Sequence, residues 1–157
     1  IRKIADEIEY TPPIVYEYFE SKEDLIREIV FSGFTKLSKE FIAARESETD
    51  PKKILEILSM VHWDFAFANK ELYQLMFRLE KPMANEEMHE SRKFIEETFL
   101  KLLNEKEALF EVMFSWMCIV NGAISVVMKF PNMHHLKGRD PKELYKSMIR
   151  RFVNSLK

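Results

Sequence analysis

The most constraining feature of this sequence is the close succession of helix breaks in its first 25 residues. An amphipathic segment that ends near Ile8 is followed at once by Thr11-Pro12-Pro13, and a second break comes at Ser21. Thr is a good helix N-cap and Pro suits the first helical turn, so a very short helix should begin at Pro12. Two short helices joined by a tight turn are the outline of a helix-turn-helix, whose second helix enters the major groove of DNA.

The pattern within this short second helix separates an inner face from an outer one. Val15 and Phe19 are four residues apart, so they share one face and should pack inward. The remaining side chains then point outward: Ile14, Tyr16, Glu17 and Tyr18. Ser21 can cap the long helix that follows, and Lys22 then stands where a cation gains nothing from the helix dipole. A phosphate opposite Lys22 would explain its position; the simpler alternative is a solvated helix surface with two tyrosines.

These residues resemble the N-terminus of the tetracycline-repressor (TetR) family of one-component bacterial regulators. The resemblance ends at Leu25 and is carried by Ile4-Ala5, Val15-Tyr16, Tyr18-Phe19 and Ser21-Lys22-Glu23. It implies that three side chains hold DNA phosphates: Tyr16, Tyr18 and Lys22. It also implies that a second group lies at or near base edges: Thr11, Pro12, Pro13, Ile14 and Glu17. Arg2 would reach a base or a phosphate, and the family commonly carries Gly where this chain has Glu9 and Pro13.

The charge of this region does not by itself favour a polyanionic partner. Residues 1–30 carry eight acidic and four basic side chains, a net charge of −4, whereas DNA-binding surfaces are usually basic. The chain begins with Ile1, partway into a helix, so we expect a first helix and a basic arm to precede the sequence given. A second hypothesis therefore stays open, namely a helical ligand-binding or protein-interaction bundle that no longer binds DNA.

Composition predicts an all-α fold. The 157 residues include only 3 Gly and 6 Pro, and helix-forming residues are abundant. The single cysteine, Cys118, allows no internal disulfide and fits a reducing cytoplasm, where we expect the protein to act. The longest apolar stretch, 114–130, is interrupted by polar residues, so it predicts a buried helix and no membrane span.

Helix punctuation divides the rest of the chain. The long helix from Lys22 should run to about residue 45, with an inner side formed by Leu25, Ile29, Phe34 (or Phe31), Leu37 and Phe41. Asp50-Pro51 and Asp140-Pro141 are typical helix starts. Further helices are expected at 51–68, 71–80, 85–103, 105–130 and 141–156. We therefore expect a partial helix-turn-helix domain with its connecting helix at 1–45, and a regulatory ligand-binding and dimerisation domain at 46–157.

The helix at 105–130 is apolar nearly all round and must be covered on both sides. One stripe contains Leu109, Val112, Trp116, Val120, Ala123 and Val127, and a second contains Phe110, Phe114, Met117, Ile124 and Met128. The C-terminal helix offers a further stripe formed by Tyr145, Met148, Ile149, Phe152, Val153 and Leu156. Two such helices from each of two chains would form a four-helix bundle, so we expect the homodimer that the resemblance also implies. The alternative is a monomer whose core absorbs these stripes.

Aromatic and methionine residues gather in the expected regulatory domain, and most of them should be core. A ligand pocket is mostly apolar with a few fixed polar groups, and a buried amide needs partners, so Asn121 is the best polar candidate. His62 is either a second pocket group or a core histidine. The candidate ligand-binding residues are His62, Tyr73, Phe77, Met113, Trp116 and Asn121. We expect them to bind a small apolar or amphipathic effector.

The segment 72–77 and Trp116 with Asn121-Gly122 resemble a TetR C-terminal subtype marked by Trp-His-Gly, with Asn121 in place of His.

The sequence gives little support for metal, cofactor or enzyme chemistry. His134-His135 lack partners at metal-ligand spacing, so neither a metal nor a cofactor is expected. No nucleophile–base pair, P-loop or dinucleotide fingerprint is present, so we expect no enzyme. The sequence predicts a dimeric, ligand-responsive transcriptional regulator, acting as a repressor on a palindromic double-stranded DNA operator.

Overall fold

A computed structural model of the chain describes residues 7, 9, 11–78, 84–130 and 138–156, and in these ranges it contains helices and no strand. The helices are α2 (Pro12–Tyr18), α3 (Lys22–Ala43), α4 (Pro51–Ala68), α5 (Lys70–Met76), α6 (Glu86–Leu100), α7 (Leu109–Lys129) and α8 (Pro141–Ser155). Short 3-10 turns occur at Ala44–Ser47 and Lys106–Ala108. The all-α prediction is confirmed. Arg2, His134 and His135 lie outside the described residues.

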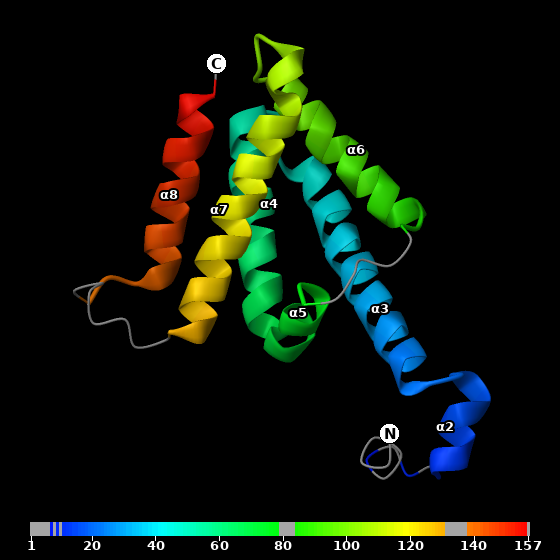
Figure 1. Ribbon diagram of the computed structural model, residues 1–157. Coiled ribbons are helices and arrows are strands. Elements are labelled where there is room, and N and C mark those ends of the chain that lie inside the picture. Colours follow the sequence, from blue (N-terminus) through cyan, green and yellow to red (C-terminus); the bar gives the residue numbers. More distant parts are fainter. Residues whose placement is uncertain (1–6, 8, 10, 79–83, 131–137, 157) are drawn as a thin grey trace.

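The helix α3 connects a small N-terminal head to a larger helical bundle (Figure 1). Within the bundle α4 contacts α3, α6, α7 and α8. The short helix α5 follows α4 directly and packs on α3. The N-terminal end of α7 and the C-terminal end of α8 lie at the end of the bundle away from the head (Figure 1).

Helix starts follow the predicted capping chemistry. The side chains of Ser21, Asp50 and Asp140 each accept a hydrogen bond from a backbone N–H in the first turn, at 3.0, 2.9 and 3.1 Å. Asn85 caps α6 in the same way, through Met88 N at 2.9 Å. Thr11 occupies the N-cap position of α2, but its side chain forms no capping hydrogen bond. These bonds satisfy amides that lack an intrahelical partner, which fixes where each helix begins.

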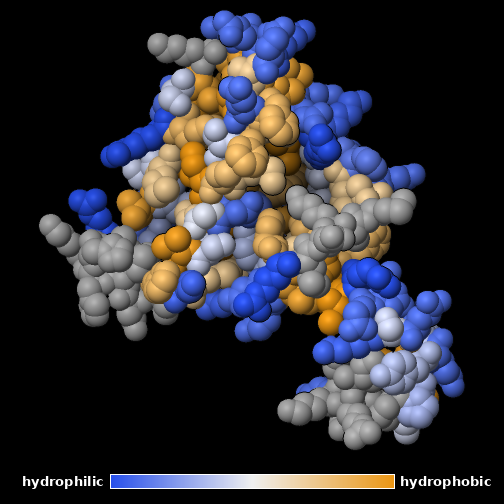
Figure 2. Space-filling model, in the orientation of Figure 1, coloured by the Kyte–Doolittle hydropathy of each residue, from blue (hydrophilic) through white to orange (hydrophobic). Residues whose placement is uncertain are grey.

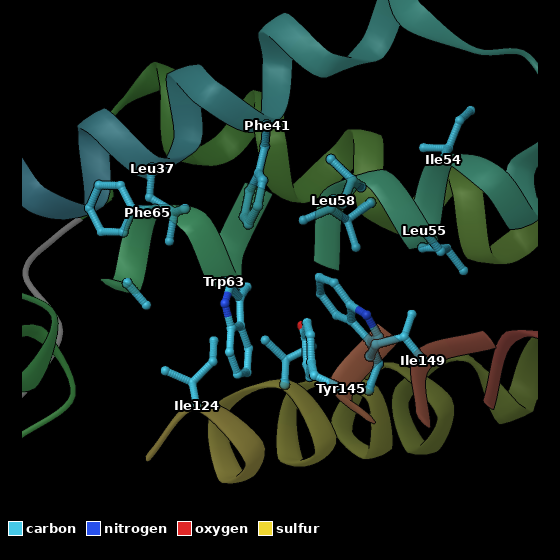
Figure 3. Packing of buried hydrophobic residues seen from close by; sticks show 14 of the residues in the cluster. Leu37, Phe41, Ile54, Leu55, Leu58, Trp63, Phe65, Ile124, Tyr145 and Ile149 are labelled. Carbon is cyan, nitrogen blue, oxygen red and sulfur yellow. The ribbon is translucent and has the colours of Figure 1, made fainter. Parts of the chain in front are cut away.

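The hydrophobic core is centred on α4, whose inward residues include Leu55, Leu58, Trp63 and Phe65 (Figure 3). The Trp63 ring stacks on Tyr145 of α8, with ring centroids 4.7 Å apart. The prediction that Ile29 lies on the inner side of α3 is wrong. Its side chain is 37% exposed, whereas that of the neighbouring Val30 is 1% exposed. The burial of Val30, Gly33, Leu37 and Phe41 at three- and four-residue spacing shows the true inner face of this helix.

The C-terminal stripe requires a correction. Tyr145, Ile149 and Val153 are at most 1% exposed because they pack into the core of their own protomer. The Tyr145 hydroxyl also donates to the backbone oxygen of Ser59 at 2.9 Å. These residues are therefore not available to a second chain, and Met148 is the member of the predicted stripe that stays exposed.

The helix α7 is covered on one side. Trp116, Val120 and Ile124 lie in the core, whereas Phe110 and Phe114 are 79% and 59% exposed. The predicted stripe that begins at Leu109 therefore faces the core. The predicted stripe that begins at Phe110 is only partly exposed, because its member Ile124 packs inward. By length and composition the segment Lys106–Lys129 could cross a membrane. This single helix does not indicate a membrane protein, because its inner face is part of the bundle core.

Candidate functional site

The head is held together by a small apolar cluster of its own. Val15 of α2 and Leu25 of α3 are 5% and 9% exposed, and Phe19 packs against them. This contact fixes α2 on the start of α3, as the four-residue spacing of Val15 and Phe19 predicts. The inner face of α2 is thus used for structure, and its outer face is available for binding.

The outer face of the head carries the predicted DNA-binding side chains. Tyr16 and Tyr18 are 52% and 77% exposed. Thr11, Pro13, Glu17 and Lys22 are also exposed, and Ile14 is half-buried. The side chain of Pro12 is outside the described part of the structure, as is Arg2. All the described members of the predicted set are therefore accessible to a macromolecular partner, in whole or in part.

One acidic side chain near Lys22, that of Asp24, is occupied by local contacts. Asp24 accepts a hydrogen bond from Glu20 N at 3.2 Å and forms an ion pair with Arg27 at 3.4 Å. Lys22 itself forms no ion pair with any described residue. Its ammonium group at the start of α3 is therefore available to an external anion such as a phosphate.

The turn before α2 is conformationally constrained. Glu9 has a φ of 58°, in the left-handed region that favours glycine. A residue with a Cβ pays about 1–2 kcal/mol for that conformation. The family resemblance expects Gly here, and the structure shows that this chain keeps the left-handed conformation with Glu in its place.

Three of the predicted ligand-binding residues meet between α4, α5 and α7. The Tyr73 hydroxyl donates to Asn121 Oδ1 at 2.7 Å and lies 3.2 Å from His62 Nε2. The single phenol proton of Tyr73 is used in the hydrogen bond to Asn121. The hydrogen bond between Tyr73 and His62 therefore uses the Nε2–H of His62 as its donor. We call these three residues the polar triad.

The polar triad lies against aromatic rings. The His62 ring is 5.8 Å from Phe41 and 6.0 Å from Phe77, between ring centroids. Phe77 is 37% exposed and Asn121 is half-buried, so this region has an accessible edge. Burial raises the pKa of the Tyr73 phenol well above its usual range, which keeps it a neutral hydrogen-bonding group. The arrangement places hydrogen-bonding groups beside an apolar surface.

The other two predicted ligand-binding residues lie elsewhere. The Trp116 indole donates to Ser59 Oγ at 2.9 Å and packs edge-on against Phe99. Trp116 is therefore bound to the core, and Met113 is a half-buried residue that packs against the same core. Sequence reasoning missed Ser59, which joins α4 to both α7 and α8. The available signal was a small polar residue in the apolar stripe of α4.

A close contact links the helix of Tyr73 to the helix of the head. A Cβ on Gly33 of α3 would come within 2.6 Å of Met76 Sδ and 3.1 Å of Leu72 Cδ1, both on α5. A β-carbon at this position would require the Met76 side chain to shift, so glycine suits the close approach of α5 to α3. The polar triad is thus connected to α3 through one short, tightly packed helix, a relationship that the sequence pattern did not reveal.

A separate apolar groove lies between α7 and α8. Its volume is about 430 Å³, and its lining includes Trp63, Ile119, Gly122, Val126, Leu144 and Met148. None of the predicted ligand-binding residues lines it.

Comparison with known proteins shows a family match at the N-terminus and a similar fold over nearly the whole chain. Residues 1–29 match the family described as bacterial regulatory proteins, tetR family. No curated protein matches the chain. A protein of unknown function from Rhodococcus sp. RHA1 shares its fold, with a TM-score of 0.72 at 19% identity over 99% of this chain and 83% of that one. A candidate regulatory protein, SCO4313, has a TM-score of 0.65 at 16% identity over 98% of this chain and 84% of that one. The match at residues 1–29 supports an N-terminal head of the tetR regulatory type, and the two solved structures show that the fold of the chain is shared.

Proposed function

We propose that the protein is a cytoplasmic, ligand-responsive repressor that binds a palindromic operator as a homodimer. In this proposal residues 1–45 form the DNA-binding domain with its connecting helix, and residues 46–157 form the regulatory and dimerisation domain. The observation that carries it is the exposure of Tyr16, Tyr18 and Lys22 on a head whose opposite face is fixed by Val15 and Leu25.

On the DNA side, each exposed group has a role that its chemistry allows. Tyr16 and Tyr18 offer hydroxyl donors, and Lys22 offers an ammonium group, all suited to phosphate oxygens. Thr11 at the N-cap and Pro13, Ile14 and Glu17 on α2 would lie toward base edges, as would Pro12. Arg2 would contact a base or a phosphate from the segment that precedes α2.

On the ligand side, the polar triad indicates the chemical class of the effector. His62, Tyr73 and Asn121 provide hydrogen-bonding groups beside aromatic rings, and Phe77 leaves the edge of this region accessible. An amphipathic molecule with an apolar body and one uncharged polar group fits this environment. In this proposal Met113 and Trp116 support the site from the core and do not contact the effector.

Ligand binding would reach the DNA through α5. Tyr73 and Met76 lie on the same short helix, and Met76 contacts α3 at Gly33. A ligand that changes the position of Tyr73 therefore changes the packing of α5 on the helix that carries the head. By linkage, an effector that weakens operator binding must itself bind less well to the operator complex, by the same factor.

The proposal is tested by fluorescence anisotropy with a palindromic operator and with random duplex DNA at several salt concentrations. Half-sites should lie about 34–36 Å apart, or a multiple of this distance. Lys22→Ala should weaken binding to both DNAs and lower the salt slope by roughly 1, because one phosphate contact is lost. Lys93→Ala, on the exposed face of α6, is the control with the same change of charge. Unchanged binding by Lys22→Ala at every salt concentration would contradict the role of Lys22.

The second candidate function is a ligand-binding bundle that no longer binds DNA. It is favoured by the net charge of −4 over residues 1–30. Effector binding together with no affinity for any duplex at low salt would support this alternative over the repressor.

A further inference from the structure

The helix α2 directs its single charged side chain, that of Glu17, away from the rest of the head. Glu17 is exposed, whereas Val15 is 5% exposed in the apolar cluster with Leu25. Successive residues of an α-helix are about 100° apart around its axis, so Glu17 lies nearly opposite Val15. Its carboxylate forms no ion pair and no side-chain hydrogen bond with any described residue. Its acceptor oxygens are therefore available to a group outside the protein.

Two exposed tyrosines flank Glu17 on α2. Tyr16 and Tyr18 are its neighbours in the sequence, so they lie about 100° to either side of it around the helix. Figure 1 shows α2 at the end of α3 away from the bundle, and Figure 2 shows a mainly hydrophilic surface over the described part of the head. Phenols that contact the phosphates on the two sides of the major groove leave Glu17 facing the base edges on its floor.

A carboxylate in the major groove is favourable opposite few groups. The phosphates repel it, as do the acceptor atoms on the base edges, which are N7 and O6 of guanine, N7 of adenine and O4 of thymine. The hydrogen-bond donors on the floor of the groove are the amino groups of cytosine (N4) and adenine (N6). Because an ionised carboxylate only accepts hydrogen bonds, Glu17 stabilises a complex with DNA when it meets one of these two amino groups.

Of the two amino groups, that of cytosine suits a carboxylate better. In an A·T pair the N6 amino group of adenine lies between two acceptors, N7 of the same base and O4 of thymine. In a G·C pair the N4 amino group of cytosine has an acceptor on one side only, O6 of guanine, and a C–H group on the other. A carboxylate that approaches cytosine therefore meets less repulsion than one that approaches adenine.

The remainder of α2 lacks the side chains that usually recognise purines. Bidentate contacts to guanine come from Arg or Lys, and those to adenine come from Asn or Gln. The helix α2 contains none of these four residue types. Pro13 is four residues before Glu17, so it lies on the same side of the helix, and its exposed apolar ring suits the methyl group of thymine. Glu17 therefore supplies the charged base contact that α2 can make.

We infer that Glu17 selects a cytosine in each half-site of the operator by accepting a hydrogen bond from the N4 amino group of that base. This inference rests on the proposed function, because it requires α2 to lie in the major groove. Guanine at the same position would place two acceptors against the carboxylate, so Glu17 also disfavours the wrong base. Replacement of the cytosine by any other base should weaken operator binding at least about fivefold, the lower end of the cost of one mismatched base pair.

The test is the selection of bound sequences from a library of random duplex DNA. The wild-type protein should enrich a cytosine at one position of each half-site. Glu17→Gln should change that preference to adenine, because an amide matches N6 and N7 of adenine, and Glu17→Ala should leave no base preferred there. Glu28→Gln makes the same change of charge at an exposed residue of α3, so it is the matched control and should retain the cytosine.

Affinity for random duplex DNA separates base recognition from the effect of charge. Glu17→Gln and Glu28→Gln should both bind random DNA at least as tightly as wild type, because each loses a negative charge. Identical base preferences in wild type, Glu17→Gln and Glu17→Ala overturn the inference and leave the proposed function standing. A wild-type preference for a base other than cytosine, at the position that Glu17→Gln alters, overturns the inference in the same way. A wild-type protein that enriches no sequence overturns both.

Discussion

The Tyr73 hydroxyl donates a 2.7 Å hydrogen bond to Asn121 Oδ1, which joins α5 to the most apolar helix of the bundle. If Asn121 orients the effector, Asn121→Leu should blunt the response to ligand and leave operator affinity without ligand unchanged. Gln74→Leu, on the exposed face of α5, is the control. The measurement is a titration of operator binding against effector for each protein. Equal ligand sensitivity in wild type and Asn121→Leu would remove Asn121 from the site, and loss of operator binding without ligand would mark it as structural.

The same hydrogen bonds should contribute measurably to stability. Tyr73→Phe removes a hydroxyl that Asn121 Oδ1 and His62 Nε2 both contact. Because buried polar groups then lose a partner, the free energy of unfolding should fall by about 1–3 kcal/mol. Urea denaturation followed by circular dichroism measures the change. Tyr18→Phe removes a phenol that is 77% exposed and should leave stability unchanged; a similar loss in both variants would show that the triad contributes nothing.

The contact between Gly33 and Met76 predicts a response opposite to helix propensity. Gly33→Ala should stabilise an isolated helix, yet its Cβ would lie 2.6 Å from Met76 Sδ. We expect a net loss of about 1–3 kcal/mol in the free energy of unfolding, because the core must shift to accept the methyl group. In a Met76→Ala background the same substitution should cost much less, and urea denaturation of the double-mutant cycle measures this coupling. Additive effects of the two substitutions would contradict direct contact.

Several parts of the structure were accessible to sequence reasoning because their causes are local. The caps at Ser21, Asp50 and Asp140 depend on residues within one turn, and each forms the expected bond. The inward packing of Val15 and Phe19 follows from helical spacing alone. The sequence pattern predicted that His62, Tyr73 and Asn121 belong to one ligand-binding site, but it did not predict the hydrogen bonds between them. Their hydrogen bonds depend on how three helices pack.

The errors arise where a pattern shows that a face is apolar without showing what covers it. Tyr145, Ile149 and Val153 are spaced for an interface, yet α4 and α7 of the same protomer cover them. Periodicity likewise cannot distinguish Gly33 from Gly122. A β-carbon at Gly33 would meet side chains of α5, whereas a β-carbon at Gly122 would meet no atom within 4 Å. The role of Ser59 was also missed, because its partners are 57 and 86 residues away along the chain.

The left-handed conformation of Glu9 predicts a stabilising substitution. Glu9→Gly should raise the melting temperature of the protein, because the residue with φ of 58° would no longer carry a Cβ. The expected gain is on the order of 0.5–1 kcal/mol, reduced by the greater flexibility of glycine in the unfolded chain. Glu9→Ala removes the same charge and keeps a Cβ, so it should bring no such gain. Equal melting temperatures for the two variants would show that the backbone conformation is not the cause.

Two buried phenols predict a loss of stability at alkaline pH. Burial raises the pKa of Tyr73 and of Tyr145 well above the ordinary value, and their side chains are 2% and 1% exposed. Above a pH of about 10 the unfolded chain releases these two protons and the folded protein keeps them. The free energy of unfolding should therefore be insensitive to these groups below that pH and fall by up to about 1.4 kcal/mol per pH unit for each tyrosine above it.

The share of each phenol in this alkaline loss can be separated by substitution. Urea denaturation between pH 8 and 12 should show a shallower alkaline slope for Tyr73→Phe, because one of the two groups that release a proton on unfolding is gone. Tyr18→Phe provides the control, since its phenol is largely exposed in the folded protein. The informative quantity is the difference in slope between the two variants. If both variants keep the wild-type slope, the burial of Tyr73 does not govern its ionisation.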